Sequence, residues 1–195
     1  MKHRITGIII GLMICALPGS SYSESKIPQA GDEFPSISLA LSETSISREY
    51  LGVTGSKLFK ISDIKADAVI IQIFSMYCPH CQKEAPNVNR LFEKLSQHPD
   101  LKDKIKLIGI GTGNSAYEVA VFQKKYQIQF PLFEDPDFTI HNRVGEARTP
   151  YFFGVKSDGA KKTKVFFSKL GGFDDPERFL NEIASLSGIK KGGAK

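Results

Sequence analysis

The chain has 195 residues, of which 41% are hydrophobic and 24% charged, and these values fit one globular domain with a real core. Its formal net charge of +5 raises the question of a nucleic-acid partner, but basic and acidic residues are interspersed along the chain. Two of the basic residues, Lys2 and Arg4, also lie in a segment that we expect to be removed. We therefore exclude nucleic acid as a partner.

The first 23 residues have the pattern of a secretory signal peptide. A short basic start, Lys2–Arg4, precedes an apolar run over Ile5–Leu17, and Ser21–Ser23 forms a cleavage site of small residues before Glu24. The apolar run is shorter than a comfortable membrane span, and an uncleaved anchor is the alternative. We expect a periplasmic or otherwise extracytoplasmic protein, with membrane contact only if this segment is retained.

The cysteines point to redox chemistry. Loss of the signal segment removes Cys15 and leaves only Cys78 and Cys81, a Cys-x-x-Cys pair. An exported chain with no other thiols is not using disulfides to stabilise its fold, so we interpret this pair as a redox couple.

We place the domain at residues 34–188. The part of it before the cysteines predicts an N-terminal extension. Residues 24–33 are polar and predict a flexible lead outside the core. Alternating residues predict an edge strand over 34–41. Two β-like pieces, 50–53 and 57–61, are separated by glycines and predict a β-hairpin.

The centre of the domain is an apolar, β-branched run over Ala68–Phe74, which predicts a buried strand leading into a helix. Cys78 therefore lies at the start of this helix, where unpaired N–H groups and the helix dipole favour an anion. We expect Cys78 to be the attacking sulfur and Cys81, one turn later, the resolving one. Pro79 suits the first helical position, and a protonated His80 would further stabilise the Cys78 thiolate.

The remaining pattern alternates strands and helices. Strands are predicted over 105–110, 151–155 and 163–170, a connector or short strand over 130–133, a turn over 157–159, and helices over 79–97, 116–125, 138–144 and 175–186. This order predicts an α/β fold, a mixed central sheet with helices on both faces, followed by a disordered tail over 189–195.

Three motifs occur together in this framework. Cys78-Pro79-His80-Cys81 follows the apolar strand, the helix continues as Gln82-Lys83-Glu84-Ala85-Pro86, and Thr149-Pro150 precedes an aromatic strand. In these motifs the chain, over about residues 34–186, resembles thioredoxin-fold proteins, specifically the TlpA/ResA-like extracytoplasmic thiol-disulfide oxidoreductases of the wider redoxin (AhpC/TSA-like) group. The resemblance implies exchange of disulfides with protein cysteines.

The resemblance also implies roles for residues around the pair. Pro150 would form a cis peptide bond and face the disulfide, with the Thr149 backbone available to the substrate; an ordinary trans proline is the alternative. Glu84 would be partly buried, with a raised pKa, and would exchange protons with Cys81; a solvated helix glutamate is the alternative. Tyr77 replaces the tryptophan that is usual before the first cysteine, and would line the substrate groove or cover the helix end.

The implied chemistry needs no cofactor beyond the Cys78–Cys81 disulfide and no metal. The implied partners are cysteine-containing exported proteins and a membrane or periplasmic thiol protein that exchanges electrons. Apocytochrome c, an oxidase subunit and general secreted proteins remain open as substrates. Direction is open too, since Pro79-His80 resembles the oxidase DsbA, whereas the TlpA/ResA branch reduces. Gln72 stands where thioredoxin has a buried acid, so the thioredoxin route for protons is not available.

Two alternative functions share the fold. A thiol peroxidase is suggested by Ser75, three residues before Cys78, and by Arg148, but Ile71 stands where peroxiredoxins carry proline. A copper chaperone would bind Cu(I) through the two cysteines and His80 or His141, although such relatives have a wider cysteine spacing.

Overall fold

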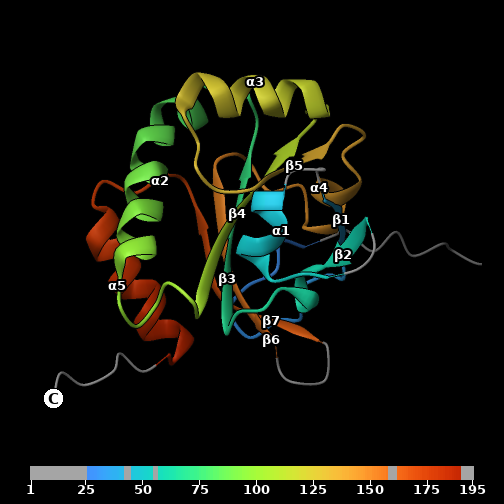
Figure 1. Ribbon diagram of the computed structural model, residues 1–195. Helices are drawn as coiled ribbons and strands as arrows, with labels where there is room; N and C mark the ends of the chain where they lie inside the picture. Colours follow the sequence, from blue (N-terminus) through green and yellow to red (C-terminus); the bar gives the residue numbers. More distant parts are fainter. Residues whose placement is uncertain (1–25, 42–44, 55–56, 158–161, 190–195) are drawn as a thin grey trace, which may run out of the picture.

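The protein is described here from a computed structural model. The described residues are 26–41, 45–54, 57–157 and 162–189. A five-stranded sheet forms the centre, in the order β5-β4-β3-β6-β7 (Figure 1). Its strands are β3 (Ala68–Phe74), β4 (Ile105–Thr112), β5 (Leu132–Asp135), β6 (Tyr151–Ser157) and β7 (Thr163–Leu170). The first three run parallel, whereas β6 is antiparallel to β3 and β7 to β6. The predicted mixed α/β sheet is confirmed.

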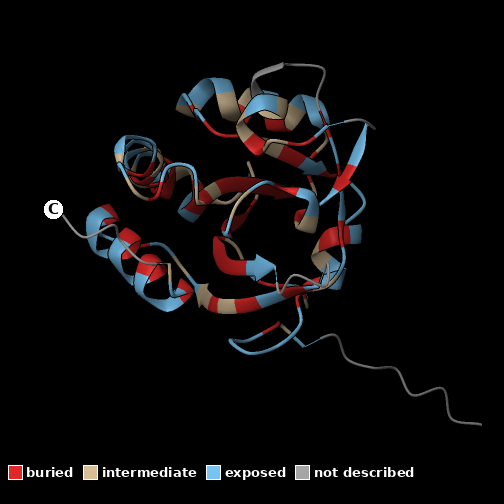
Figure 2. Cartoon of the chain, turned by 60° about the horizontal axis from the view of Figure 1, so that its bottom comes forward, coloured by how far each residue is buried: buried red, intermediate tan, exposed pale blue. Residues whose placement is uncertain are grey.

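Helices cover both faces of this sheet because successive side chains of a strand point to opposite sides. In β3, Ile70 and Phe74 belong to one buried cluster and Ile71 and Ile73 to the other. The first cluster lies under α2 (Pro79–Gln97), α3 (Ala116–Tyr126) and α5 (Pro176–Ser187). The second lies under α1 (Ser45–Leu51), α4 (Thr139–Arg143) and the small sheet of β1 (Ser38–Ala40) and β2 (Leu58–Lys60). Figure 2 shows the buried residues concentrated along the strands and the inner helix faces.

Helix α2 starts where the sequence predicts. Cys78 is its N-cap residue, with extended backbone, and Pro79 occupies the first turn, where a missing N–H costs nothing. The buried residues of α2 recur every three or four positions, which is the spacing of one helix face. They are Cys81, Glu84, Ala85, Val88, Leu91 and Leu95. The second sulfur therefore points into the core, while the first lies at the rim.

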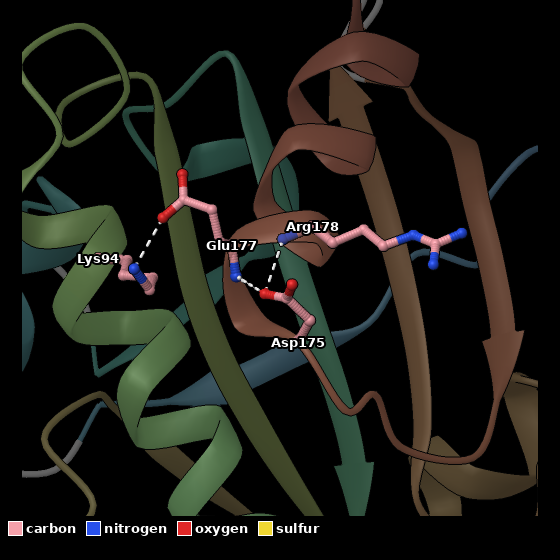
Figure 3. A network of polar contacts seen from close by, with 4 residues as sticks. All are labelled: Lys94, Asp175, Glu177 and Arg178. Carbon is pink, nitrogen blue, oxygen red and sulfur yellow. Dashed lines mark hydrogen bonds and ion pairs between the residues drawn. The ribbon is translucent and has the colours of Figure 1, made fainter.

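Helix α5 packs beside α2 and ends the described domain (Figure 1). Its N-cap is Asp175, whose Oδ1 accepts the backbone N–H groups of Glu177 and Arg178 at 2.9 and 3.1 Å (Figure 3). Lys94 Nζ of α2 lies 2.7 Å from Glu177 Oε2, an ion pair between exposed side chains whose attraction water screens. Apolar packing, rather than this pair, therefore holds the two helices together.

The N-terminal extension differs from the prediction in its pairing. β2 is antiparallel to β1, with Leu39 opposite Phe59, and residues 50 and 51 belong to α1 rather than to a strand. The physical reason is tertiary. Tyr50 turns its hydroxyl to the Leu107 N–H at 2.8 Å, on a part of β4 that β5 does not reach, and Leu51 is fully buried. The two-stranded extension exists, but its strands are separated by a helix.

The described part of the lead, residues 26–33, is mostly exposed, but it pairs with the sheet. Gly31 N donates to Val165 O at 2.8 Å and Phe34 N to Thr163 O at 2.7 Å, so this segment lies along the outer edge of β7. Pairing an edge strand satisfies backbone groups that would otherwise face water, which explains the packing. The predicted turn over 157–159 and the tail lie largely outside the described residues, as does the signal segment. In the described part of the chain, no helix is long and apolar enough to cross a membrane.

Candidate active site

Cys78 and Cys81 lie together at the carboxyl end of β3, as expected. Both are free thiols, Cys78 partly exposed and Cys81 buried. Cys78 N donates to Ser75 O at 3.1 Å, and the Cys78 carbonyl accepts Gln82 N at 3.0 Å. These bonds fix a tight turn between strand and helix, which presents the first sulfur at the surface and directs the second inward.

The Cys78 sulfur has the surroundings of a nucleophile. Partial burial by itself raises the pKa of Cys78, but hydrogen bonds from the Thr149 side chain, from Cys81 and from the His80 backbone outweigh it, so the net pKa is lowered. His80 thus contributes through its backbone at the helix start. A lowered pKa increases the thiolate fraction, and the thiolate is the reactive form.

Cys81 has the opposite character. Its residue surface is 0% exposed, and this burial raises the pKa of the thiol to about 12. The neighbouring Cys78 sulfur raises it further, and the backbone of Ser75 opposes the shift. Cys81 therefore stays protonated at neutral pH and needs a base before it can attack.

Glu84 lies one helical turn beyond Cys81 on the same buried face. It is 8% exposed, and its Oε1 accepts the Phe173 backbone N–H at 2.9 Å. Burial raises the pKa of Glu84, while the bonds from Phe173 and Asn87 lower it in part. Glu84 is thus buried rather than solvated, and its exchange of protons with Cys81 stays a prediction. Gly172 makes room for this carboxylate, because a Cβ at that position would collide with it.

The Thr149–Pro150 peptide bond is cis, as the resemblance implies. Thr149 faces the first sulfur, since Cys78 Sγ lies 3.4 Å from its carbonyl oxygen. Pro150 is buried and Arg148 exposed. The loop before β6 therefore forms one wall of the site.

A groove of about 580 Å³ opens between this wall and α2. It is lined by His80, Lys83, Glu84, Asn87, Arg148, Thr149, Pro150 and the turn Leu170–Asp174. The groove brings four of the predicted site residues, His80, Glu84, Thr149 and Pro150, into one concave surface. It has the position and size to receive a segment of polypeptide beside Cys78.

Tyr77 lies on the other side of Cys78, away from that groove. Its side chain is 64% exposed, and its hydroxyl donates to Glu118 Oε1 at the start of α3. This bond raises the pKa of Tyr77 and lowers the pKa of Glu118. Among the two roles expected for Tyr77, this placement agrees with covering the strand–helix junction.

Sequence reasoning missed Asn114. This side chain is fully buried, and its Oδ1 accepts the Met76 backbone N–H at 2.8 Å. Gln82 Nε2 donates to the Met76 carbonyl, also at 2.8 Å, so both polar groups of that peptide position are bound by side chains. The only signal in the sequence was a polar residue directly after a glycine-rich strand end.

The structure also places residues that bear on the thioredoxin proton route and on the copper alternative. Gln72 is buried in β3, on the α2 face, where it cannot ionise. His141 has its Nε2 3.1 Å from the Ala147 carbonyl oxygen. Within the described ranges, no group of three or more His, Cys, Asp and Glu side chains is placed to bind a metal ion.

Comparison with known proteins places this geometry in context. Residues 30–171 match the model of the AhpC/TSA family. The chain is 27% identical over 169 residues to the thiol-disulfide oxidoreductase ResA of Bacillus subtilis, covering 84% of this chain and 85% of that protein.

Two solved structures are similar in fold. One is a thiol:disulfide interchange protein of the thioredoxin family from Chlorobium tepidum, with a TM-score of 0.54, 19% identity, and coverage of 82% of this chain and 97% of that one. The other is a secreted disulfide oxidoreductase of Mycobacterium tuberculosis homologous to DsbE, with a TM-score of 0.51, 18% identity, and coverage of 67% and 90%. These likenesses support the thioredoxin-like fold.

Proposed function

The chain belongs to the AhpC/TSA family, and on this premise we propose that it is an exported thiol-disulfide oxidoreductase of the ResA/DsbE type that acts on protein cysteines. One observation carries the proposal. A partly exposed Cys78 with a lowered pKa stands at a helix start, one turn before a buried Cys81 whose pKa is about 12. Disulfide exchange requires these two roles: a thiolate that attacks the substrate and a protected thiol that later resolves the mixed disulfide.

The exchange proceeds in two steps when the protein acts as a reductant. The Cys78 thiolate attacks one sulfur of a substrate disulfide, that S–S bond breaks, and the released thiolate takes up a proton. Cys81 then loses its proton and attacks Cys78 Sγ, which breaks the mixed disulfide. The substrate leaves as a dithiol and the protein keeps a Cys78–Cys81 disulfide. Oxidation of a substrate dithiol is the same sequence in reverse.

Glu84 is the proposed partner for the Cys81 proton. It lies on the same buried helix face, and burial moves its pKa upward, toward the range in which a carboxyl group both accepts and donates protons near neutrality. Gln72 cannot replace it. We assign Thr149 and Pro150 to the wall that contacts the bound substrate segment, beside the groove at His80.

Export and partners follow from the N-terminal pattern and from the chemistry. We place the protein in the periplasm or another extracytoplasmic space, in agreement with the secreted relative of Mycobacterium tuberculosis. Its partners would be cysteine-containing exported proteins and a membrane or periplasmic thiol protein that restores its redox state. No cofactor is needed beyond the disulfide. Maturation of cytochrome c is one process that consumes such reducing equivalents.

The peroxidase alternative has less support. The Ser75 hydroxyl accepts from Asn114 Nδ2 at 3.5 Å, and Ile71 is buried in the middle of β3 where peroxiredoxins carry proline. The copper alternative is weakened by His141, whose Nε2 is bound to a backbone carbonyl. Rapid oxidation of Cys78 by peroxide to a sulfenic acid would favour the first of these, and cysteine-dependent copper binding the second.

The decisive experiment compares Cys78→Ser and Cys81→Ser in the purified mature protein, with insulin reduction and oxidation of a model dithiol as assays. We expect Cys78→Ser to be inactive in both and Cys81→Ser to accumulate a mixed disulfide with a cysteine-containing substrate. Activity retained by Cys78→Ser would refute the proposal. The direction of exchange follows from the reduction potential of the Cys78–Cys81 pair. A value of about −120 mV indicates an oxidant, and one of about −270 mV a reductant.

A further inference from the structure

His141 holds the loop that carries Thr149. Its Nε2 lies 3.1 Å from the carbonyl oxygen of Ala147, a buried residue two positions before Thr149. A carbonyl oxygen can only accept, so Nε2 carries a proton and donates it. This bond fixes the start of the wall that faces Cys78.

His141 is itself anchored to the sheet. Asp135, the last residue of β5, accepts the Ile140 N–H with Oδ1 and the His141 N–H with Oδ2, each at 2.9 Å. Asp135 is only 2% exposed. A buried carboxylate bonded to two backbone N–H groups is a strong, oriented contact. The backbone of α4 at His141 thus has a fixed position relative to the central sheet.

The same sheet end also supports the opposite side of Cys78. Asp135 N donates to the Asn114 carbonyl at 3.2 Å, and Asn114 Oδ1 binds the Met76 N–H. Two chains of contacts therefore run from Asp135 to Cys78. One passes through Asn114 to the turn before the sulfur, and the other through His141 to the loop that faces it.

We propose that His141 is a positioning residue of the redox site, which holds the Ala147–Pro150 loop where Thr149 contacts Cys78. The 3.4 Å approach of Cys78 Sγ to the Thr149 carbonyl, to which the thiol donates, shows that Thr149 lies against the sulfur. The interaction to be maintained is the hydrogen bond from the Thr149 side chain, which lowers the pKa of Cys78. If His141 released Ala147, Thr149 would move from the sulfur and the thiolate would lose this side-chain donor. This inference rests on the proposed function only in taking Cys78 as the reactive thiol.

The test measures the rate of Cys78 alkylation by iodoacetamide from pH 5 to 10 in four reduced variants. His141→Leu removes the donor, and we expect about five-fold slower alkylation at pH 7, with the inflection of the pH profile at higher pH, as for the loss of one hydrogen bond of about 1 kcal/mol. His141→Gln places an amide N–H near the position of Nε2 and should restore the rate to within about two-fold. Asn142→Ala, exposed on the same helix, is the matched control.

Asp135→Asn is the fourth variant. It keeps one acceptor oxygen and weakens the anchor of α4, so we expect its pH profile of Cys78 alkylation to lie between those of the wild type and His141→Leu. The proposal is overturned if His141→Leu lowers thermal stability but leaves the pH profile of Cys78 unchanged, or if His141→Gln behaves like His141→Leu. Alkylation requires no substrate protein. Failure here therefore leaves the exchange assays with the cysteine variants unaffected, and the two proposals can fail separately.

Discussion

The two cysteines in the first turn of α2 have identical side chains but opposite chemistry. Cys78 lies at the partly exposed rim of the site, and Cys81 lies at its buried floor. Cys78 and Cys81 lie within the same helix start, and a helix dipole alone contributes only about 0.3–1 kcal/mol to an anion there. Full burial shifts a titratable group by up to several pKa units. Cys81, inside the core, therefore has a pKa of about 12, whereas backbone and side-chain donors lower that of Cys78. Depth in the fold, more than position in the motif, decides which sulfur reacts.

The largest expected effect is the difference in alkylation between these two thiols. At pH 7 the thiolate fraction falls ten-fold for each unit of pKa above 7, so Cys78 should react with iodoacetamide at least about 1,000-fold faster than Cys81. Mass spectrometry of peptides from a time course measures both rates. In urea the two rates should converge. Similar rates in the folded protein would contradict the contrast between rim and floor.

Glu84→Gln removes the proposed base from the floor and leaves the rim intact. We expect resolution of the mixed disulfide by Cys81 to slow about ten-fold or more, because general acid–base groups contribute at least that much. Release of a coloured thiol from a Cys78 mixed disulfide, followed by stopped flow, measures this step. Alkylation of Cys78 serves as the control and should change little. Equal resolution rates in the two proteins would remove Glu84 from the mechanism.

The difference in unfolding free energy between the wild type and Glu84→Gln should also depend on pH. Burial raises the pKa of Glu84, so the folded protein holds this proton to higher pH than the unfolded chain does. The stability that this proton contributes is fully present below the unfolded pKa and is lost as pH rises through the folded pKa. Relative to Glu84→Gln, the wild type should therefore lose unfolding free energy as the pH rises above the ordinary carboxyl pKa of 4.5, as measured by urea denaturation. A constant difference would mean that Glu84 is solvated.

Two adjacent glycines allow the surroundings of Glu84 to be disturbed without replacing an ionisable residue. A Cβ at Gly172 would collide with the Glu84 carboxylate, whereas a Cβ at Gly171 would meet no atom within 4 Å. Gly172→Ala should cost about 1–3 kcal/mol through overpacking and slow the Cys81 step, less than Glu84→Gln does. Gly171→Ala, at φ +88°, should cost about 1 kcal/mol and leave that step unchanged. Identical kinetics for both would deny that Gly172 positions the carboxylate.

The site was predictable where its residues are neighbours in sequence. The apolar run of β3, the helix start at Pro79 and the spacing of Cys81 and Glu84 follow from local periodicity, and the structure has them as expected. The cis bond before Pro150 came from the resemblance, since a single X-Pro pair carries no such information by itself. Local pattern thus gave the reactive turn and the buried face beneath it.

The supporting contacts were not predictable because they join distant parts of the chain. Asn114 binds Met76 across 38 residues, and Tyr50 binds Leu107 across 57. No periodicity links such pairs. Tyr50 and its neighbours have β-forming side chains, yet burial of Leu51 and the free edge of β4 place them in a helix, so tertiary context overrode propensity.

Tyr50→Phe offers the smallest expected effect on the thiols and a clear effect on the fold. The Leu107 N–H would lose its 2.8 Å acceptor in a buried place, which costs about 1–3 kcal/mol of unfolding free energy. Tyr117→Phe, whose side chain is 78% exposed, is the control and should cost almost nothing. Tyr50 contacts β4 far from the cysteines in the fold, so the pH profile of Cys78 alkylation should be the same in both variants. A shifted profile in Tyr50→Phe would show that loss of stability alone alters the thiol, and the contrast between Cys78 and Cys81 would then report the whole fold rather than their immediate surroundings.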